Sequence, residues 1–183
     1  MYRLPPGCDE PAFKLLLEYW HGKRRDGRLP GRKDVDPLEL PKALLPQILL
    51  FDVIRADRLR FRFRLAGTAF GKLIGRDVTG HIFDEIAPPE RVAPVNGALT
   101  AIAESGRPAY LGGRLTLRSD SFEEVRRLGV PLAADGHRVD MILALWLAQP
   151  GPTGALPIAA RTEPPAGRIH LLEEEIHPAT TLH

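Results

Sequence analysis

The residues best suited to acid–base chemistry are two pairs of adjacent carboxylates, Asp84-Glu85 and Glu123-Glu124. A catalytic pair must converge on one substrate, whereas neighbouring side chains in a strand or helix point apart. Neither pair therefore predicts a catalytic dyad. The sequence also contains no GxSxG, phosphate-loop or HExxH motif. We expect no enzymatic activity, although a buried carboxylate or histidine in a polar cleft would revive that hypothesis.

Cysteine and histidine give no sign of a metal site. The single cysteine, Cys8, allows no internal disulfide, and no Cys/His spacing resembles a zinc site. The first residues lack the apolar segment of a signal peptide, and the longest apolar run, Met141 to Ala148, is too short to span a bilayer. These features predict a cytoplasmic protein that binds no metal and does not enter a membrane.

A ladder of arginines alternates with apolar residues at Arg58, Arg60, Arg62 and Arg64. Such a ladder could bind an acidic partner or nucleic acid. The chain, however, has 25 Lys and Arg against 23 Asp and Glu, so its net charge is only +2. Nucleic-acid-binding proteins usually concentrate a larger positive excess. We therefore interpret the ladder as the solvated face of an edge strand and do not expect nucleic acid as a partner.

The spacing of apolar residues predicts the elements that position these groups. One helical stripe runs through residues 13–20, and a short helix opens at Asp36. Short helices are expected between residues 66 and 106, where Pro94 and Asn96-Gly97 predict a kink or a late helix start. The expected strands are 48–54, 59–65, 109–117, 122–133 and 138–148.

Two of these strands have apolar residues on both faces. They are the first and the last, and strands buried on both sides occupy the middle of a sheet. The second sheet face then needs a cover. The amphipathic N-terminal helix can supply it, either from the same chain or from a dimer partner.

Five segments in order carry a family resemblance: LPKALLPQILLFDV, FRFRLAGTAF, GRDVTGHIFDEI, AIAESGRPAY and VPLAADGHRVDMILALW. They resemble a family of short single-domain bacterial PAS proteins with a helical N-terminal extension. The resemblance implies an α+β fold with a five-stranded antiparallel sheet of order 2-1-5-4-3. Helices would cover one face and the N-terminal helix the other. The expected parts are an N-terminal helix and loop (1–35), a PAS domain (36–149) and a Pro/Gly-rich linker and tail (150–183).

The resemblance also implies a signalling role without a fused output domain. Its first form is an adaptor that acts through homodimerisation and contacts with an unidentified signalling protein. The alternative is a sensor that binds a small apolar or mixed ligand between helices and sheet. Haem would require an axial histidine, but His81 and His137 lie in polar loop sequences. A flavin adduct would require a cysteine inside the core, and Cys8 precedes it. Both cofactors are therefore not expected.

Two sets of residues are expected to form the functional surfaces. The residues that would face the ligand space are Phe61, Phe63, Phe70, Phe83, Leu99, Ile102, Tyr110, Arg127, Met141 and Leu143. Those that would form the dimer or lid surface are Phe13, Leu16, Leu17, Trp20 and Trp146.

Overall fold

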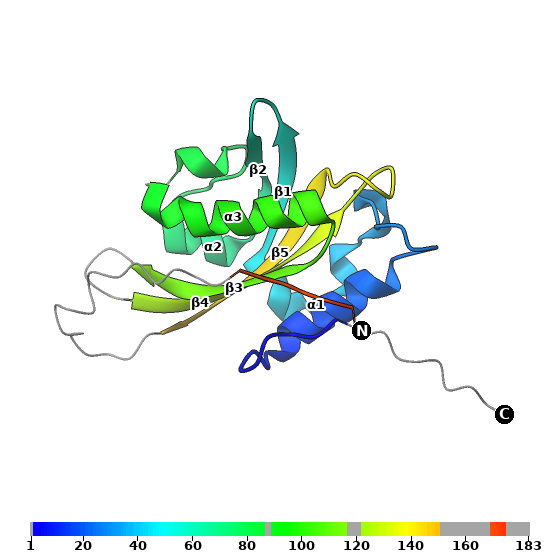
Figure 1. Ribbon diagram of the computed structural model, residues 1–183. Coiled ribbons are helices and arrows are strands. Elements are labelled where there is room, and N and C mark those ends of the chain that lie inside the picture. Colours follow the sequence, from blue (N-terminus) through cyan, green and yellow to red (C-terminus); the bar gives the residue numbers. More distant parts are fainter. Residues whose placement is uncertain (1, 87–88, 117–121, 151–168, 175–183) are drawn as a thin grey trace.

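The alternation of arginine and apolar residues produces strand β2 (Leu59–Ala66), in which Phe61 and Phe63 are buried while Arg62 and Arg64 face solvent. Leu65, expected on the buried side, is 44 % exposed. Strand β2 is one edge of an antiparallel sheet with the strand order β2-β1-β5-β4-β3-β6 (Figure 1). The computed structural model describes residues 2–86, 89–116, 122–150 and 169–174. The remaining strands are β1 (Ile48–Arg55), β3 (Ala109–Thr116), β4 (Phe122–Leu132), β5 (Met141–Pro150) and β6 (Ile169–Leu171).

The predicted order 2-1-5-4-3 is confirmed, and a sixth strand that was not predicted extends the sheet beyond β3. Residues 169–171, expected to belong to the linker and tail, form β6 and pair with Ala109–Leu111 at the edge of β3. A strand of three residues has too short an apolar pattern to be recognised in sequence. The rest of the predicted linker and tail, 151–168 and 175–183, lies outside the described residues.

Helices cover both faces of the sheet. The first face carries α2 (Thr68–Ile74) and α3 (Pro89–Ser105), and the second carries α1 (Pro11–Gly22) (Figure 1). The short helix expected at Asp36 is instead a pair of 3₁₀ helices, Pro37–Glu39 and Lys42–Gln47, and two further 3₁₀ helices are Arg32–Asp34 and Phe83–Glu85.

Helix α1 forms because its apolar residues recur on one side and Pro11 suits its first turn. All four residues of its stripe are buried against the sheet of the same chain. At its end, the indole Nε1–H of Trp20 donates a hydrogen bond of 2.7 Å to the carbonyl oxygen of Pro131 in β4. The cover of the second face thus comes from this chain's own helix.

Helix α3 continues through Pro94 and Gly97 to Ser105, so the late start considered for it is wrong. A proline inside a helix loses one N–H donor and its ring crowds the carbonyl four residues earlier, yet this helix continues past Pro94. Gly106, with a positive φ of 66°, follows the last residue and ends the helix.

Candidate functional site

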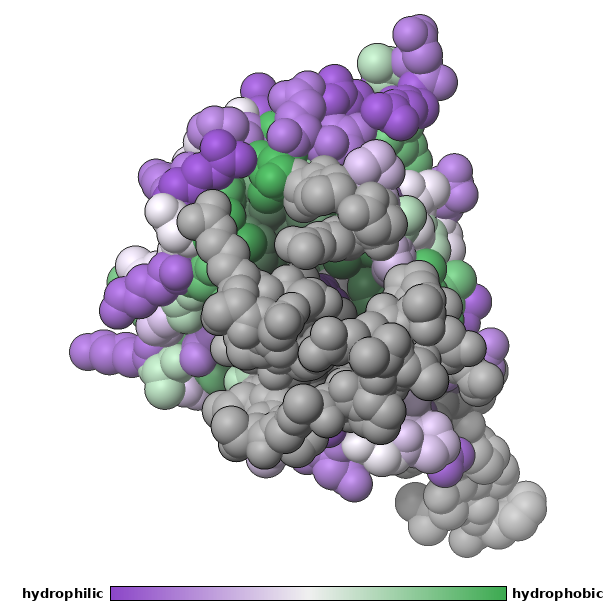
Figure 2. Space-filling view, turned by 90° about the vertical axis from the view of Figure 1, so that its left-hand side faces the viewer, coloured by the Kyte–Doolittle hydropathy of each residue, from purple (hydrophilic) through white to green (hydrophobic). Residues whose placement is uncertain are grey.

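The helix-facing side of the sheet is lined by aromatic side chains. Phe63 on β2 is the centre of this group, with ring centroids 4.7 Å from Phe51, 5.5 Å from Phe70 and 5.7 Å from Phe83. Figure 2 shows apolar side chains between polar ones on the side of the molecule that faces left in Figure 1. The side chains between helices and sheet therefore form an apolar layer.

Two hydrogen-bond donors interrupt this apolar layer. Trp146 on β5 and Arg127 on β4 are directly opposite each other in the antiparallel pair, so their side chains share the helix-facing side. Trp146 is 5 % exposed and its ring lies 5.4 Å from that of Phe70 in α2. Its indole Nε1–H is buried and has no hydrogen-bond partner among the described residues. A buried unpartnered donor is uncommon in native proteins and calls for an explanation.

The guanidinium of Arg127 is the second donor. Within the residues that the structure describes, no carboxylate pairs with it, and burial alone lowers its pKa to about 10. The side chain is half-buried and remains positively charged at neutral pH. Beside it on the other flank lies Leu111 of β3, which is buried. The two neighbouring donors thus have apolar surroundings and a net positive charge.

The structure places most of the predicted ligand-facing residues on this side of the sheet. Arg127 shares this side with the buried Phe61, Phe63, Phe83, Leu99 and Ile102 and the partly buried Phe70. That they line a ligand space stays a prediction.

Three residues of that set, however, lie on the opposite face. Tyr110, Met141 and Leu143 pack with α1, and the Tyr110 ring lies 6.0 Å from that of Phe13. Trp146 was expected on the α1 side but packs on the side that faces α2 and α3. Strand β5 is apolar on both faces, so its sequence does not reveal which alternate residues face which layer, and a shift of one residue exchanges them.

The predicted dimer or lid residues on α1 are all buried within the chain. Phe13, Leu16, Leu17 and Trp20 are each 0–4 % exposed and pack against the chain's own sheet. A dimer contact through this stripe would require α1 to leave the sheet.

The arginine ladder is paired within the chain. Arg58 and Arg60 bind Asp84, with nitrogen–oxygen distances of 2.8 and 2.6 Å, and Arg60 also binds Glu85. Arg62 and Arg64 bind Asp52 at 2.8 and 2.6 Å. Hydrogen bonding from Arg60 holds the pKa of Asp84 below its usual value. These carboxylates therefore neutralise part of the ladder's charge.

Cys8 precedes the expected core in the sequence, but its side chain is buried. It is 3 % exposed, belongs to the core under α1, and its Sγ donates to the Oε2 atom of Glu10 at 3.2 Å. Burial raises the pKa of the thiol, which stays protonated at neutral pH. The two histidines considered for haem, His81 and His137, are exposed.

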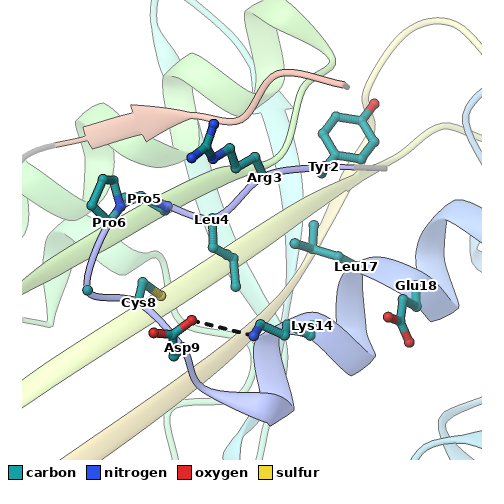
Figure 3. A pocket seen from close by; sticks show the side chains of 11 residues that line it. Tyr2, Arg3, Leu4, Pro5, Pro6, Cys8, Asp9, Lys14, Leu17 and Glu18 are labelled. Carbon is teal, nitrogen blue, oxygen red and sulfur yellow. Dashed lines mark hydrogen bonds and ion pairs between the residues drawn. The ribbon is translucent and has the colours of Figure 1, made fainter. Parts of the chain in front are cut away.

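A pocket of about 380 Å³ lies beside Cys8, between the N-terminal segment and α1 (Figure 3). Leu4 and Leu17 line it together with a charged pair, Lys14 and Asp9, whose nitrogen and oxygen are 3.4 Å apart. Arg3 and Glu18 add one further charge of each sign to its lining. Groups of three or more metal-binding side chains are absent from the described part of the chain.

Comparison with known proteins agrees with the sheet order. A family model described as a PAS domain matches residues 8–147, which include α1, β1 to β4 and most of β5. No curated protein matches the sequence. No helix within the described ranges has both the length and the apolar character needed to cross a membrane.

Proposed function

We propose that this chain, which belongs to the PAS domain family, is a sensor that binds a small anionic molecule between α2, α3 and the sheet. The observation that carries the proposal is the buried indole N–H of Trp146, which lacks an acceptor and lies opposite the Arg127 guanidinium. PAS domains are in general sensory or signalling modules.

The chemistry of the two donors defines the ligand class. A carboxylate or phosphate oxygen can accept hydrogen bonds from an indole N–H and a guanidinium together, and arginine binds such groups with matched geometry. The remainder of the ligand would contact apolar and aromatic side chains such as Phe70. We therefore expect a carboxylic or phosphoric acid with an apolar or aromatic body.

The site gives no reason to expect catalysis. Arg127 and Trp146 donate hydrogen bonds but are not nucleophiles or general bases at neutral pH. We propose binding alone, with no bond made or broken.

Signalling through a homodimer remains an open prediction. It needs another surface, because the stripe on α1 is buried within the chain. No described feature favours that function over ligand binding.

Ligand binding is tested with protein that has been unfolded and refolded to remove any bound molecule. Thermal unfolding is followed with aromatic carboxylates and with their neutral amides at equal concentration. We expect acids to raise the melting temperature and amides to have little effect. Native mass spectrometry of protein purified without unfolding would identify a retained acid.

Two substitutions and two matched controls locate the site. R127Q should weaken binding of an acid about 10-fold or more, since a hydrogen bond to a charged group is worth about 1.5–3 kcal/mol. W146F should weaken it by a smaller factor. R76Q changes an exposed arginine and W20F changes the tryptophan under α1, so both should leave affinity unchanged. Equal binding of acids and amides, or undiminished binding by R127Q, would contradict the proposal.

A further inference from the structure

Residues 169–174, which we call the strap, lie along the edge of β3, where Ile169 pairs with Leu111, the neighbour of Arg127 in the sheet. Strand β6 pairs with Ala109–Leu111, and the backbone N–H of Leu172 extends the pairing by donating to the carbonyl oxygen of Pro108 at 2.8 Å. The strap follows β5 after residues 151–168 and is therefore attached to the domain on its N-terminal side by that segment alone.

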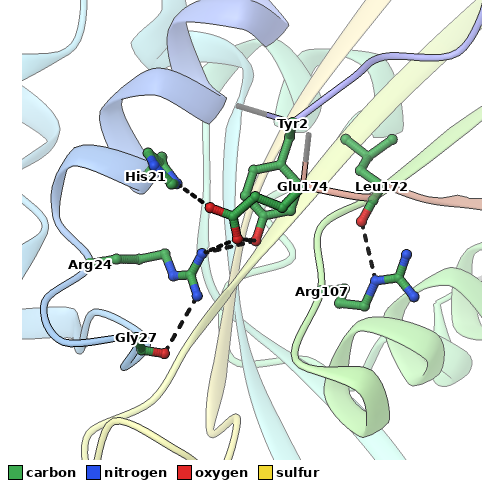
Figure 4. A network of polar contacts seen from close by, with 7 residues as sticks. All are labelled: Tyr2, His21, Arg24, Gly27, Arg107, Leu172 and Glu174. Carbon is green, nitrogen blue, oxygen red and sulfur yellow. Dashed lines mark hydrogen bonds and ion pairs between the residues drawn. The ribbon is translucent and has the colours of Figure 1, made fainter. Parts of the chain in front are cut away.

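One apolar side chain anchors the strap. Leu172 is 3 % exposed and belongs to the core under α1, whereas Ile169 and Leu171 are 40 % and 36 % exposed. The carbonyl oxygen of Leu172 accepts a hydrogen bond of 3.2 Å from Nε of Arg107 (Figure 4). Leu172 thus occupies an apolar socket with an arginine at its rim.

Charged contacts hold the end of the strap. Glu174 Oε2 lies 3.0 Å from Nη1 of Arg24 at the end of α1, and the same nitrogen donates to the Tyr2 hydroxyl at 3.0 Å (Figure 4). Nδ1 of His21 is 3.8 Å from the other oxygen of Glu174. Arg107 also pairs with Glu173 at 3.4 Å. The body of the protein therefore presents two arginines to two successive glutamates.

These contacts have the three components of β-strand recognition. An exposed strand edge supplies backbone hydrogen bonds, and side-chain sockets supply specificity. Here the edge is β3, the socket holds Leu172, and the cations are Arg24 and Arg107. The socket and cations select an apolar residue followed by acidic ones.

Occupation of this edge by the strap is limited. The strap pairs with three of the eight residues of β3, and along Gly112–Thr116 that edge has no strand partner among the described residues. The ion pairs at the end of the strap are exposed as well, since the side chains of Glu173 and Glu174 are 88 % and 43 % accessible. Exposed ion pairs are weakened by salt, so a short strand with one buried anchor can detach without unfolding the sheet.

We propose that the edge of β3, the Leu172 socket and the two arginines form a peptide-docking site, which the strap occupies in cis. Its partner is an extended segment of another protein with the strap's pattern, an apolar residue followed by acidic residues. The strap is an internal competitor that keeps the site closed. This proposal does not depend on the ligand site at Trp146.

Displacement of the strap in the full-length chain tests the proposal. L172D places a charge in the apolar socket and should release the strap, while L38D puts the same charge on a side chain that is 77 % exposed. A fluorescent peptide with the sequence RIHLLEEE, residues 168–175, is titrated into each protein and followed by anisotropy. We expect L172D to bind it at least ~10-fold more tightly than the wild type or L38D, because tethering gives the strap a high effective concentration.

Hydrogen–deuterium exchange shows whether the edge opens. The amides of 109–111 should exchange faster in L172D than in the wild type and become protected again when peptide is added. A peptide with the Leu172→Asp change should neither bind nor protect. High salt should weaken binding of the unchanged peptide.

Two results would overturn the proposal. One is an edge that opens in L172D but gains no protection from the peptide, and the other is an edge that stays protected in L172D. If circular dichroism shows that L172D does not fold, E174Q is used in its place. This substitution of an exposed side chain weakens only the charged contacts that Glu174 makes with Arg24 and His21. The expected gain in affinity is then smaller, and failure of E174Q to increase either exchange or peptide binding would equally contradict the proposal.

Discussion

The two tryptophans allow a matched test of the unpartnered donor. Trp20 and Trp146 are buried on opposite faces of the sheet at 0 % and 5 % exposure, and they are the only tryptophans in the chain. The indole N–H of Trp20 donates to the carbonyl oxygen of Pro131, whereas that of Trp146 has no acceptor. Replacing each by phenylalanine therefore removes a satisfied donor in one variant and an unsatisfied donor in the other.

The expected free energies follow from this difference. Both substitutions lose part of a buried ring, which costs about 1–2 kcal/mol. W20F also leaves the Pro131 oxygen without its partner, which costs about 1–3 kcal/mol more. W146F instead removes an unpaired buried donor and regains about 1–3 kcal/mol. We expect W20F to lose about 3 kcal/mol of unfolding free energy, and W146F to stay within about 1 kcal/mol of the wild type.

The measurement is urea unfolding followed by circular dichroism on protein refolded free of any ligand. The dependence of the unfolding free energy on urea should be the same for all three proteins, so that their midpoints can be compared. Each variant retains a single tryptophan, whose fluorescence reports on one face of the sheet. Addition of a binding acid should stabilise W146F less than it stabilises W20F.

An equal loss of stability in the two variants would refute this reasoning. It would mean that the Trp146 indole N–H already has an acceptor in the ligand-free protein. The ligand class proposed for the site would then lose its main support. In protein that has not been refolded, W146F could instead lose more unfolding free energy than W20F. If that difference disappears after refolding, it indicates a ligand retained during purification.

Two further predictions concern a close backbone contact and an ion pair. A Cβ on Gly67 would lie 2.3 Å from the carbonyl oxygen of Pro46, so Gly67→Ala should lower the free energy of unfolding in urea by about 3 kcal/mol. The matched change Gly71→Ala has its nearest contact at 3.6 Å and should be neutral or slightly stabilising. Because Arg60 lowers the pKa of Asp84 below its ordinary 3.8, the stability from this pair should be complete above that pH and fall as pH drops through the lower, folded-state pKa. Asp84→Asn should lose that part of the acid dependence, and an unchanged pH profile of unfolding would contradict the assignment.

Patterns with a strong contrast between polar and apolar residues could be read from the sequence. Alternation in the segment 59–65 determines the two faces of β2 because the arginines cannot be buried without partners. The stripe on α1 likewise requires an apolar surface beneath it. Together with the two-sided strands, these patterns predicted that β1 and β5 are central neighbours and that β2 is an edge. The full strand order was implied by the family resemblance, and the structure confirms it.

The candidate site depended on information that the sequence lacks. Strand β5 is apolar on both faces, so its sequence is compatible with either set of alternate residues facing the helices. Packing in the folded chain selects the set that places Trp146 against Phe70. The strap is too short for a periodic pattern, and it is held by contacts with β3, with α3 and with Arg24 after α1. The sequence indicated that Arg127 could reach inward. It could not indicate that no described carboxylate pairs with Arg127, because that depends on residues distant in the chain. The sequence by itself determined the layers of this PAS domain, because burial follows residue type. The tertiary structure alone decided which donors and edges are left without partners, because hydrogen bonding depends on neighbours distant in the chain.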